Sequence, residues 1–270
     1  MSRIPFAKTE AHGNDFLLVA ETDVEPGSRE SIARAICDRL RGVGADGLIL
    51  YRGPEGDFGD FAMTLYNSDG SQAEISGNGL RCLAAYLVYR GLASRDPVEV
   101  STGAGKLSLS LLERRDFAFR FRANMGAPRD LAKETLVAEG ERFQVTTLSL
   151  GNPHCVLFRS FDVAELRRVG PRLESHPRFA RKTNVELVEI LSPSDIRMSI
   201  WERGVGETAS SGTGSSASAV ASIWNGLAKS PVRVHCPGGV MTVSWEEGSD
   251  VFLEGDAQIV AEGAYFYESL

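Results

Sequence analysis

The stretch Ser76-Gly77-Asn78-Gly79 stands before an apolar run, and the pattern returns as Ser211-Gly212-Thr213-Gly214 before a second apolar run. Each stretch also follows a strand-like segment, so each predicts a strand, a glycine-rich turn and then a helix. The two serines are 135 residues apart, which is half of the 270-residue chain. A repeat at this spacing predicts two similar domains in tandem.

The rest of the chain is rich in predicted strands. Short runs of alternating or β-branched residues recur along its whole length, whereas helical periodicity is confined to four segments. These segments are residues 31–40, 80–89, 162–169 and 215–224. Because strands and helices do not alternate regularly, a doubly wound sheet is not expected. We predict an α+β fold of two pseudo-symmetric domains, each a mixed or antiparallel sheet wrapped around a central helix.

Composition narrows the class of protein. The chain is 43% hydrophobic and 24% charged, which is a globular composition. Its formal net charge of -7 argues against a nucleic-acid or anionic-membrane binder, because such surfaces reward clustered Lys and Arg. No segment has the pattern of an export signal or a membrane span. We therefore expect a cytoplasmic protein with a small polar molecule as its partner, and neither nucleic acid nor membrane.

The four cysteines are Cys37, Cys82, Cys155 and Cys236, and they are scattered along the chain. They form no C-x-x-C pair, so the sequence predicts neither a zinc site nor a disulfide framework. No bound metal is expected. This use of cysteine fits a reducing cytoplasm.

A Ser-Gly-x-Gly turn at a helix N-terminus is suited to binding an anion. Its glycines permit close approach, and its unpaired backbone N–H groups lie at the positive end of the helix dipole. A carboxylate or an enolate-like oxygen would be stabilised there. The alternative is that Ser76 and Ser211 are ordinary N-caps. Two such turns, half a chain apart, favour a site shared by the two domains.

Other polar residues have ordinary explanations when each is taken alone. The pair Glu202-Arg203 follows an apolar strand, as a surface ion pair often does, and His154 could be a structural histidine. The segment Asn67-Ser68-Asp69-Gly70 has the composition of a turn. A nucleotide-binding interpretation of the glycine turns is weaker, because neither dinucleotide nor P-loop fingerprints are present.

Together, eight segments of this chain resemble the diaminopimelate epimerase family in order and spacing. They are Gly13-Asn-Asp-Phe16, Gly42-Val-Gly-Ala-Asp-Gly47, Asn67-Ser-Asp-Gly-Ser71, Gly77-Asn-Gly-Leu-Arg81, Gly151-Asn-Pro-His-Cys155, Lys182-Thr-Asn-Val185, Trp201-Glu-Arg-Gly-Val-Gly-Glu-Thr208 and Gly212-Thr-Gly214. The resemblance implies two similar halves, each a sheet around a central helix, with the active site in the cleft between them. The expected domains are residues 1–118, joined by residues 264–270, and residues 119–263.

The resemblance also implies an activity: inversion of LL- to meso-diaminopimelate in lysine and peptidoglycan precursor biosynthesis, without cofactor or metal. In the family, one cysteine removes the α-proton and another returns a proton on the opposite face. Those cysteines align with Ser76 and Ser211, and the residues that assist them align with His154 and Glu202. The residues that align with substrate-binding positions are Asn14, Asn67, Gly77, Asn78, Asn152, Asn184, Arg203, Gly212 and Thr213.

Serine at both cysteine positions is the main departure from the family. A free thiol ionises near about pH 8.5 and is readily tuned lower, whereas a serine hydroxyl needs a neighbouring base. Cys82 and Cys155 do not replace the missing thiols, because one lies well inside a helix and the other follows His154. A smaller departure is Ala11-His12-Gly13, where the family usually has Gly-x-Gly.

Three functional hypotheses follow. The first is an epimerase inactivated by engineered Cys→Ser changes, and the second is a natural relative that epimerises slowly or acts as another amino-acid racemase or dehydratase. The third is a non-catalytic amino-acid binder. Cysteine codons at positions 76 and 211 of the encoding gene would identify the first. The sequence also leaves open a homodimer, which is common for enzymes of this size.

Overall fold

The computed structural model describes residues 2–54, 60–73, 76–103 and 105–268. Contacts between residues divide the chain into two compact units. Unit 1 comprises Met1–Ala123 and Gly255–Leu270, and unit 2 comprises Asn124–Glu254. The sequence-based boundaries are 118/119 and 263/264, so unit 1 takes a few more residues at each division.

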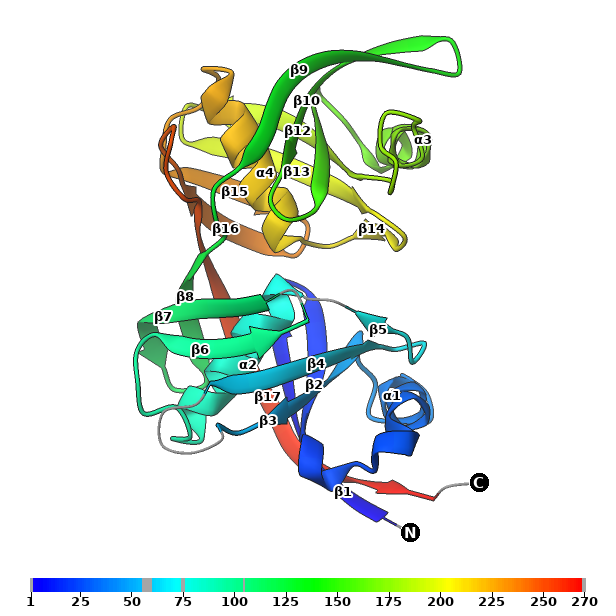
Figure 1. The fold of residues 1–270 in the computed structure, drawn as a ribbon, viewed down its shortest axis with the longest axis vertical. Helices are drawn as coiled ribbons and strands as arrows, with labels where there is room; N and C mark the ends of the chain where they lie inside the picture. The colour runs from blue at the N-terminus through cyan, green and yellow to red at the C-terminus, as the bar shows by residue number, and fades with distance from the viewer. Residues whose placement is uncertain (1, 55–59, 74–75, 104, 269–270) are drawn as a thin grey trace. The chain divides into compact units, whose positions relative to one another are not determined.

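Unit 1 is a closed ring of strands around one helix (Figure 1). Its strands are β1 (Ser2–Ala11), β2 (Asn14–Ala20), β3 (Gly47–Arg52), β4 (Phe61–Asn67), β5 (Gln72–Ala73), β6 (Val98–Thr102), β7 (Gly105–Arg115), β8 (Ala118–Asn124) and most of β17 (Phe252–Tyr267). The ring runs β1-β2-β3-β4-β6-β7-β8-β17 and returns to β1, with β5 beside β4. The pairs β2–β3 and β4–β6 are parallel.

The helices of unit 1 differ in their surroundings. The helix α2 (Gly77–Tyr89) lies inside the ring, and most of its residues are buried on every side. The helix α1 (Arg29–Cys37) connects β2 to β3 after the short 3-10 turns η1 (Glu21–Asp23) and η2 (Pro26–Ser28), and it buries only one face. Within α2, Leu83 and Leu87 are fully buried, and each such burial stabilises the fold by about 1.5–3 kcal/mol.

Unit 2 has the same order of elements. Its strands are β9 (Arg129–Ala138), β10 (Glu141–Ser149), β11 (Pro153–Phe158), β12 (Asn184–Ser192), β13 (Asp195–Glu202), β14 (Gly206–Thr208), β15 (Val232–Cys236), β16 (Gly239–Ser244) and the start of β17. They pair as β9-β10-β11-β12-β13-β15-β16-β17, with β14 beside β13 and with β11–β12 and β13–β15 parallel. The pseudo-symmetry predicted from the serine repeat is therefore present in the strand order.

The helices of unit 2 repeat the arrangement of unit 1. The central helix α4 (Gly212–Trp224) is lined by strands on all sides, and α3 (Val163–Glu174) connects β11 to β12 on the outside (Figure 1). Small residues make the enclosure of α4 possible, because Ser216, Ala217 and Ser218 let the strands approach closely. The buried Ser216 hydroxyl donates to the carbonyl oxygen of Gly212 at 2.9 Å, so its polar group is paired within the helix.

The structure confirms the predicted fold class and all four predicted helices. Three helices begin earlier than predicted, α1 at Arg29, α2 at Gly77 and α4 at Gly212, and two helix C-termini also differ from the sequence-based bounds. The helix α1 ends at Cys37 instead of residue 40, and α3 continues to Glu174 through Pro171 instead of ending at residue 169. Burial explains the longer helix: Leu173 is fully buried, and Gly170 packs directly against the Trp201 ring. The sequence did not predict five of the strands, which are β1, β5, β9, β11 and β14.

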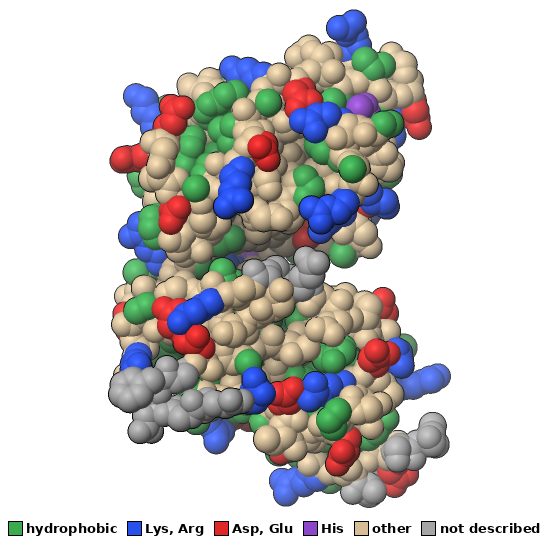
Figure 2. All heavy atoms as spheres, viewed as in Figure 1, with side chains coloured by type: hydrophobic (Ala, Val, Ile, Leu, Met, Phe, Trp, Pro, Cys, Tyr) green, Lys and Arg blue, Asp and Glu red, His purple; other side chains and the backbone are tan. Residues whose placement is uncertain are grey.

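The surface is mixed in charge. On the face of each unit drawn in Figure 2, Lys and Arg side chains are interspersed with Asp and Glu side chains. Several form ion pairs, such as Arg168 with Glu141 at 2.6 Å. In the part of the chain that the structure describes, no helix is both long enough and apolar enough to cross a membrane.

Candidate active site

The two serines of the repeat occupy the same local geometry. Ser76 is the N-cap of α2 and accepts a hydrogen bond from the backbone N–H of Gly79 at 3.1 Å. Ser211 is the N-cap of α4 and accepts from the N–H of Gly214 at 3.3 Å. Both serines have extended backbones, with φ of -133° and -145°. The remaining N–H groups of each first turn lie at the positive end of a helix dipole, where an anion is stabilised.

In unit 1, two of the predicted residues, Asn14 and Asn67, lie at the ends of strands. Asn14 begins β2 and donates to the Asp46 carboxylate at 2.5 Å. Asn67 ends β4, where it pairs with Gly47 at the start of β3. Its side-chain amide donates to the Ser71 hydroxyl at 3.0 Å. Asn14 and Asn67 therefore lie at the same edge of the sheet, and each side chain is bonded to a different neighbour.

Beside the first turn of α2 lies a buried cation. Arg81 is 1% exposed, and it donates to the side-chain oxygen of Asn78 and to the backbone oxygen of Asp256. Burial lowers the pKa of Arg81 to about 10, so its guanidinium stays charged near neutral pH. Burial, together with the charge of Arg81, lowers the pKa of His12 to about 4. The neutral His12 ring accepts a hydrogen bond from the N–H of Asp256 at 3.0 Å.

In unit 2, three of the predicted residues are joined by hydrogen bonds. His154 is fully buried on β11, and its Nε2 lies 3.0 Å from the Asn152 side-chain oxygen. The Asn152 amide donates to the hydroxyl of Thr213, in the first turn of α4, at 3.4 Å. On its other side, His154 Nδ1 lies 2.6 Å from a carboxylate oxygen of Glu186, which is also fully buried.

Glu202 ends β13 in the same unit and is half-buried. Burial raises the pKa of Glu202, and the nearby Glu186 carboxyl raises it further. A hydrogen bond from the Thr208 hydroxyl at 2.5 Å opposes this rise. Burial also raises the pKa of Glu186. Glu186 and Glu202, whose pKa values are both raised, therefore form a cluster of titratable groups with His154. Such clusters are common in acid-base active sites.

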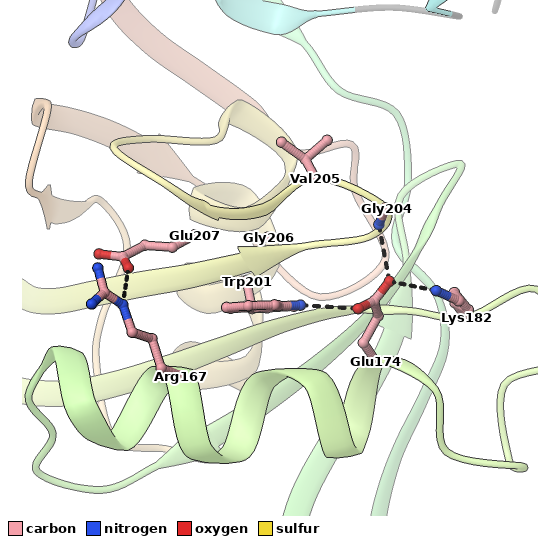
Figure 3. A pocket seen from close by; sticks show the side chains of 8 residues that line it. All are labelled: Arg167, Glu174, Lys182, Trp201, Gly204, Val205, Gly206 and Glu207. Carbon is pink, nitrogen blue, oxygen red and sulfur yellow. Dashed lines mark hydrogen bonds and ion pairs between the residues drawn. The ribbon is translucent and has the colours of Figure 1, made fainter.

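The turn after β13 carries Arg203 and is fixed at two points. The Asn184 side-chain oxygen accepts from the N–H of Arg203 at 2.8 Å, and Glu174 accepts from the N–H of Gly204 at 3.0 Å. Glu174 also accepts from Trp201 at 2.9 Å and from Lys182 at 3.1 Å, as Figure 3 shows. Burial alone would raise the pKa of Glu174, but these hydrogen bonds lower it.

An open pocket of about 590 Å³ lies beside this turn (Figure 3). Its lining consists of Arg167, Glu174, Lys182, Trp201, Gly204, Val205, Gly206 and Glu207. None of the predicted site residues lines it, and its two carboxylates are already paired within the unit. The residues that the sequence predicts for the site therefore lie outside this pocket.

The cysteines do not supply the thiols that the family uses. Cys82 and Cys155 are fully buried. Burial raises the pKa of Cys82 to about 12 and that of Cys155 well above its usual value. Neither thiol is ionised near neutral pH. Among the described residues, no three His, Cys, Asp or Glu side chains are grouped so that they could hold a metal ion.

Sequence analysis missed three residues that surround the predicted site: Glu186, Arg81 and Glu174. A signal existed for the first two, because Glu186 interrupts an apolar strand and Arg81 interrupts an apolar helix. Charged residues in such positions are rarely fully buried unless they are paired. Glu174 gave no signal, because it lies beyond the predicted end of its helix.

The fold is shared with solved structures of other proteins. A phenazine biosynthesis protein of the PhzF family from Bacillus anthracis matches 99% of this chain over 100% of its own, with a TM-score of 0.74 and 15% identity. A hydroxyproline epimerase from Agrobacterium vitis matches 97% of this chain over 92% of its own, with a TM-score of 0.69 and 13% identity. At these identities, the likeness establishes the shared fold alone.

Sequence comparison is more specific. The profile described as "Diaminopimelate epimerase" matches residues 6–130 and 146–260. A diaminopimelate epimerase from Pelotomaculum thermopropionicum is 39% identical over 98% of this chain and 99% of its own. The chain therefore belongs to the diaminopimelate epimerase family, whose members are amino-acid isomerases.

Proposed function

We propose that the protein is a diaminopimelate epimerase that inverts LL- to meso-diaminopimelate by proton transfer at the α-carbon. The observation that carries this proposal is the family match over most of the chain, together with the same Ser-capped helix N-terminus in both units. Inversion needs one group that removes a proton and another that returns one. A duplicated site at positions 76 and 211 is suited to that requirement.

The helix N-termini would stabilise the transition state. As the α-carbon loses its proton, negative charge grows on the substrate carboxylate, and N–H groups at a positive helix end favour that charge. We assign this role to the N–H groups of Gly77 and Asn78 in unit 1 and of Gly212 and Thr213 in unit 2. These donors are held in place by the helices, so little reorganisation is needed during the reaction.

The side chains around the helix ends complete the assignment. His154 and Glu202 would assist proton transfer at positions 76 and 211. Arg203 and the side-chain amides of Asn14, Asn67, Asn152 and Asn184 would hold the amino and carboxylate groups of the substrate. No cofactor enters this scheme.

Serine at both proton-transfer positions should slow the reaction. A hydroxyl is a much weaker acid than a thiol, so the population of alkoxide at Ser76 or Ser211 would be very small at neutral pH. We infer that substrate binding is kept and that epimerisation is impaired. Kept binding with impaired epimerisation is expected under all three hypotheses: a form engineered by Cys→Ser changes, a natural relative with slow or altered amino-acid chemistry, and a non-catalytic binder.

Calorimetry with LL-diaminopimelate tests the binding part of the proposal. The change Arg203→Ala should weaken binding by about 1.5–3 kcal/mol, because a charge-assisted contact to a carboxylate is lost. Arg167→Ala is the matched control, since Arg167 is an exposed arginine of the same unit that pairs with Glu207. It should leave affinity unchanged.

Unchanged affinity of Arg203→Ala for every amino acid tested would show that Arg203 does not contact the substrate. Failure of the parent protein to bind either diaminopimelate isomer would contradict the proposed substrate. Binding of a shorter amino acid in its place would favour the second hypothesis, another amino-acid racemase or dehydratase.

A further inference from the structure

A line of four hydrogen-bonded side chains leads from the interior of unit 2 to the first turn of α4. It runs from Glu186 through His154 and Asn152 to Thr213. The first two members have no solvent exposure, and Glu186 Oε2 has no hydrogen-bond partner among the described residues. A buried carboxyl that is only partly satisfied destabilises a fold, so its presence calls for another explanation.

The line fixes where the protons are. The Asn152 side-chain oxygen can only accept, so the hydrogen bond to His154 Nε2 requires a proton on Nε2. A second proton must lie between His154 Nδ1 and Glu186 Oε1, which are 2.6 Å apart. The pair is then either imidazolium with carboxylate or neutral imidazole with carboxylic acid. Its net charge is zero in both cases.

Burial favours this neutral pair over the alternative. If the pair lost one proton, His154 would keep Nδ1–H toward the carboxylate and expose a lone pair at Nε2. That state would leave a net negative charge with no solvent contact, close to the Glu202 carboxyl. An uncompensated buried charge is strongly disfavoured. The carboxyl of Glu186 therefore favours the state in which His154 Nε2 donates.

Donation from His154 Nε2 decides which way the side-chain amide of Asn152 is turned. Because His154 binds the amide oxygen of Asn152, the amide nitrogen faces Thr213 and the first turn of α4. The Thr213 hydroxyl can donate or accept, so it does not impose this orientation. With the amide reversed, an oxygen would face the N–H groups that we assign to a substrate carboxylate. That orientation would repel the carboxylate.

We propose that Glu186 is a positioning residue: through His154, it keeps the amide nitrogen of Asn152 facing the first turn of α4, so that Asn152 acts as a donor to an anionic substrate group. The role of Asn152 toward the substrate rests on the proposed function. The orientation of the amide and the proton on His154 Nε2 do not, because both are properties of the protein without substrate.

Nitrogen-15 NMR of the ligand-free protein tests the proton positions. The chain has four histidines, so His154 is assigned by comparison with His154→Gln. We expect a protonated Nε2 in the parent protein. In Glu186→Gln, both neutral tautomers of His154 should be populated, because a glutamine amide can donate to Nδ1 or accept from it. A lone pair on Nε2 in the parent protein would overturn the proposal, whatever the protein binds.

A double-mutant cycle on diaminopimelate affinity tests the coupling. Glu186→Gln should weaken binding about tenfold, and Asn152→Ala should weaken it at least as much. The double variant should match Asn152→Ala alone, because Glu186 acts through Asn152. Glu189→Gln is the control, since Glu189 lies on the same strand and pairs with Arg197 at the surface. It should not change affinity.

The outcomes separate the two proposals. If the losses of affinity in Glu186→Gln and Asn152→Ala add in the double variant, Glu186 has a general structural role and the coupling to Asn152 is rejected. Circular dichroism and thermal melting of each variant identify losses caused by unfolding. If the parent protein binds no diaminopimelate but shows the protonated Nε2, the proposed function fails and the positioning of Asn152 stands.

Discussion

The two helix N-termini carry the same serine cap but differ in the charge buried beside them. In unit 1, Arg81 places a cation next to the first turn of α2, and the adjacent His12 is kept neutral. In unit 2, the carboxyl of Glu186 lies beside Gly214 in the first turn of α4, and Glu186 is itself close to His154 and Glu202. The duplicated backbone therefore provides two helix N-termini suited to anions, and the buried side chains beside them differ in charge.

Matched glycines show how the difference arises. A β-carbon at Gly79 of α2 would meet only side-chain carbons, the nearest on Ile49 at 3.0 Å, whereas one at Gly214 of α4 would meet Ile200 at 2.5 Å and also Glu186 Oε1 at 3.3 Å. Strand β3 thus places an apolar side chain beside one glycine, and β12 places a carboxyl beside the other. An enzyme that needs one proton acceptor and one proton donor benefits from this asymmetry, because neighbouring charges shift pKa values in opposite directions.

The largest expected effect comes from restoring both thiols. In Ser76→Cys/Ser211→Cys, we expect α-proton exchange and epimerisation to rise by roughly 10²–10⁴-fold or more, which is the usual contribution of positioned acid-base groups. The measurement is incubation with LL-diaminopimelate in D₂O, following deuterium at the α-carbon and formation of the meso isomer. Each single variant should produce little net inversion, because one face lacks its acid or base.

Brisk epimerisation by the parent protein would contradict the expected impairment and would make His154 or Glu202 the bases. An inert double-cysteine variant that still binds substrate would indicate a different reaction or a binder.

A smaller effect is expected from His12, the neutral histidine beside Arg81 in unit 1. The pKa of His12 is about 4 in the folded protein against 6.5 ordinarily, so the unfolded chain binds its proton more readily. The contribution of neutral His12 to the free energy of unfolding is therefore complete above about pH 6.5. It is lost as the pH falls toward 4. The loss should amount to a few kcal/mol, at about 1.4 kcal/mol per pKa unit.

Thermal unfolding between pH 7 and pH 4 measures this loss, with His12→Gln as the comparison. The charged groups that face His12 are Arg81, Asp256 and Arg120, and they are present in both proteins. The parent protein should lose stability over this range more steeply than His12→Gln. Parallel curves would show that His12 is not the group responsible.

The smallest effect is expected when the two positions are compared directly as thiols. In the single variants Ser76→Cys and Ser211→Cys, both introduced thiols gain from a helix N-terminus. The thiol at position 211 should have the higher pKa, by about one unit, because the carboxyls of Glu186 and Glu202 disfavour a thiolate there. The pH dependence of iodoacetamide alkylation measures both values. The parent protein, whose own thiols are mostly buried, gives the background.

Equal pKa values at the two positions would mean that the helix dipoles outweigh the buried side chains. A higher value at position 76 would reverse the assignment of electrostatic roles to the two units.

The sequence by itself determined the repeat and most of the elements. The Ser-Gly-x-Gly turns predicted helices over residues 80–89 and 215–224, and the structure begins them three residues earlier, at Gly77 and Gly212, with serine caps. Such signals are local, because glycine and a capping hydroxyl act within one turn of chain. Local signals of this kind also found α1 and α3 to within a few residues at most ends. The candidate site residues came from eight segments in register, and their roles stay predictions.

Only the tertiary structure decided which charges lie beside each helix end. Glu186 and His154 are 32 residues apart, and Arg81 and Asp256 are 175 apart. No local pattern specifies such pairs. They form because β11 and β12 are parallel neighbours and because β17 closes the ring around α2. The identity of a buried charged residue is visible in the sequence, but its partner, and therefore its pKa and its role, depends on which strands pair.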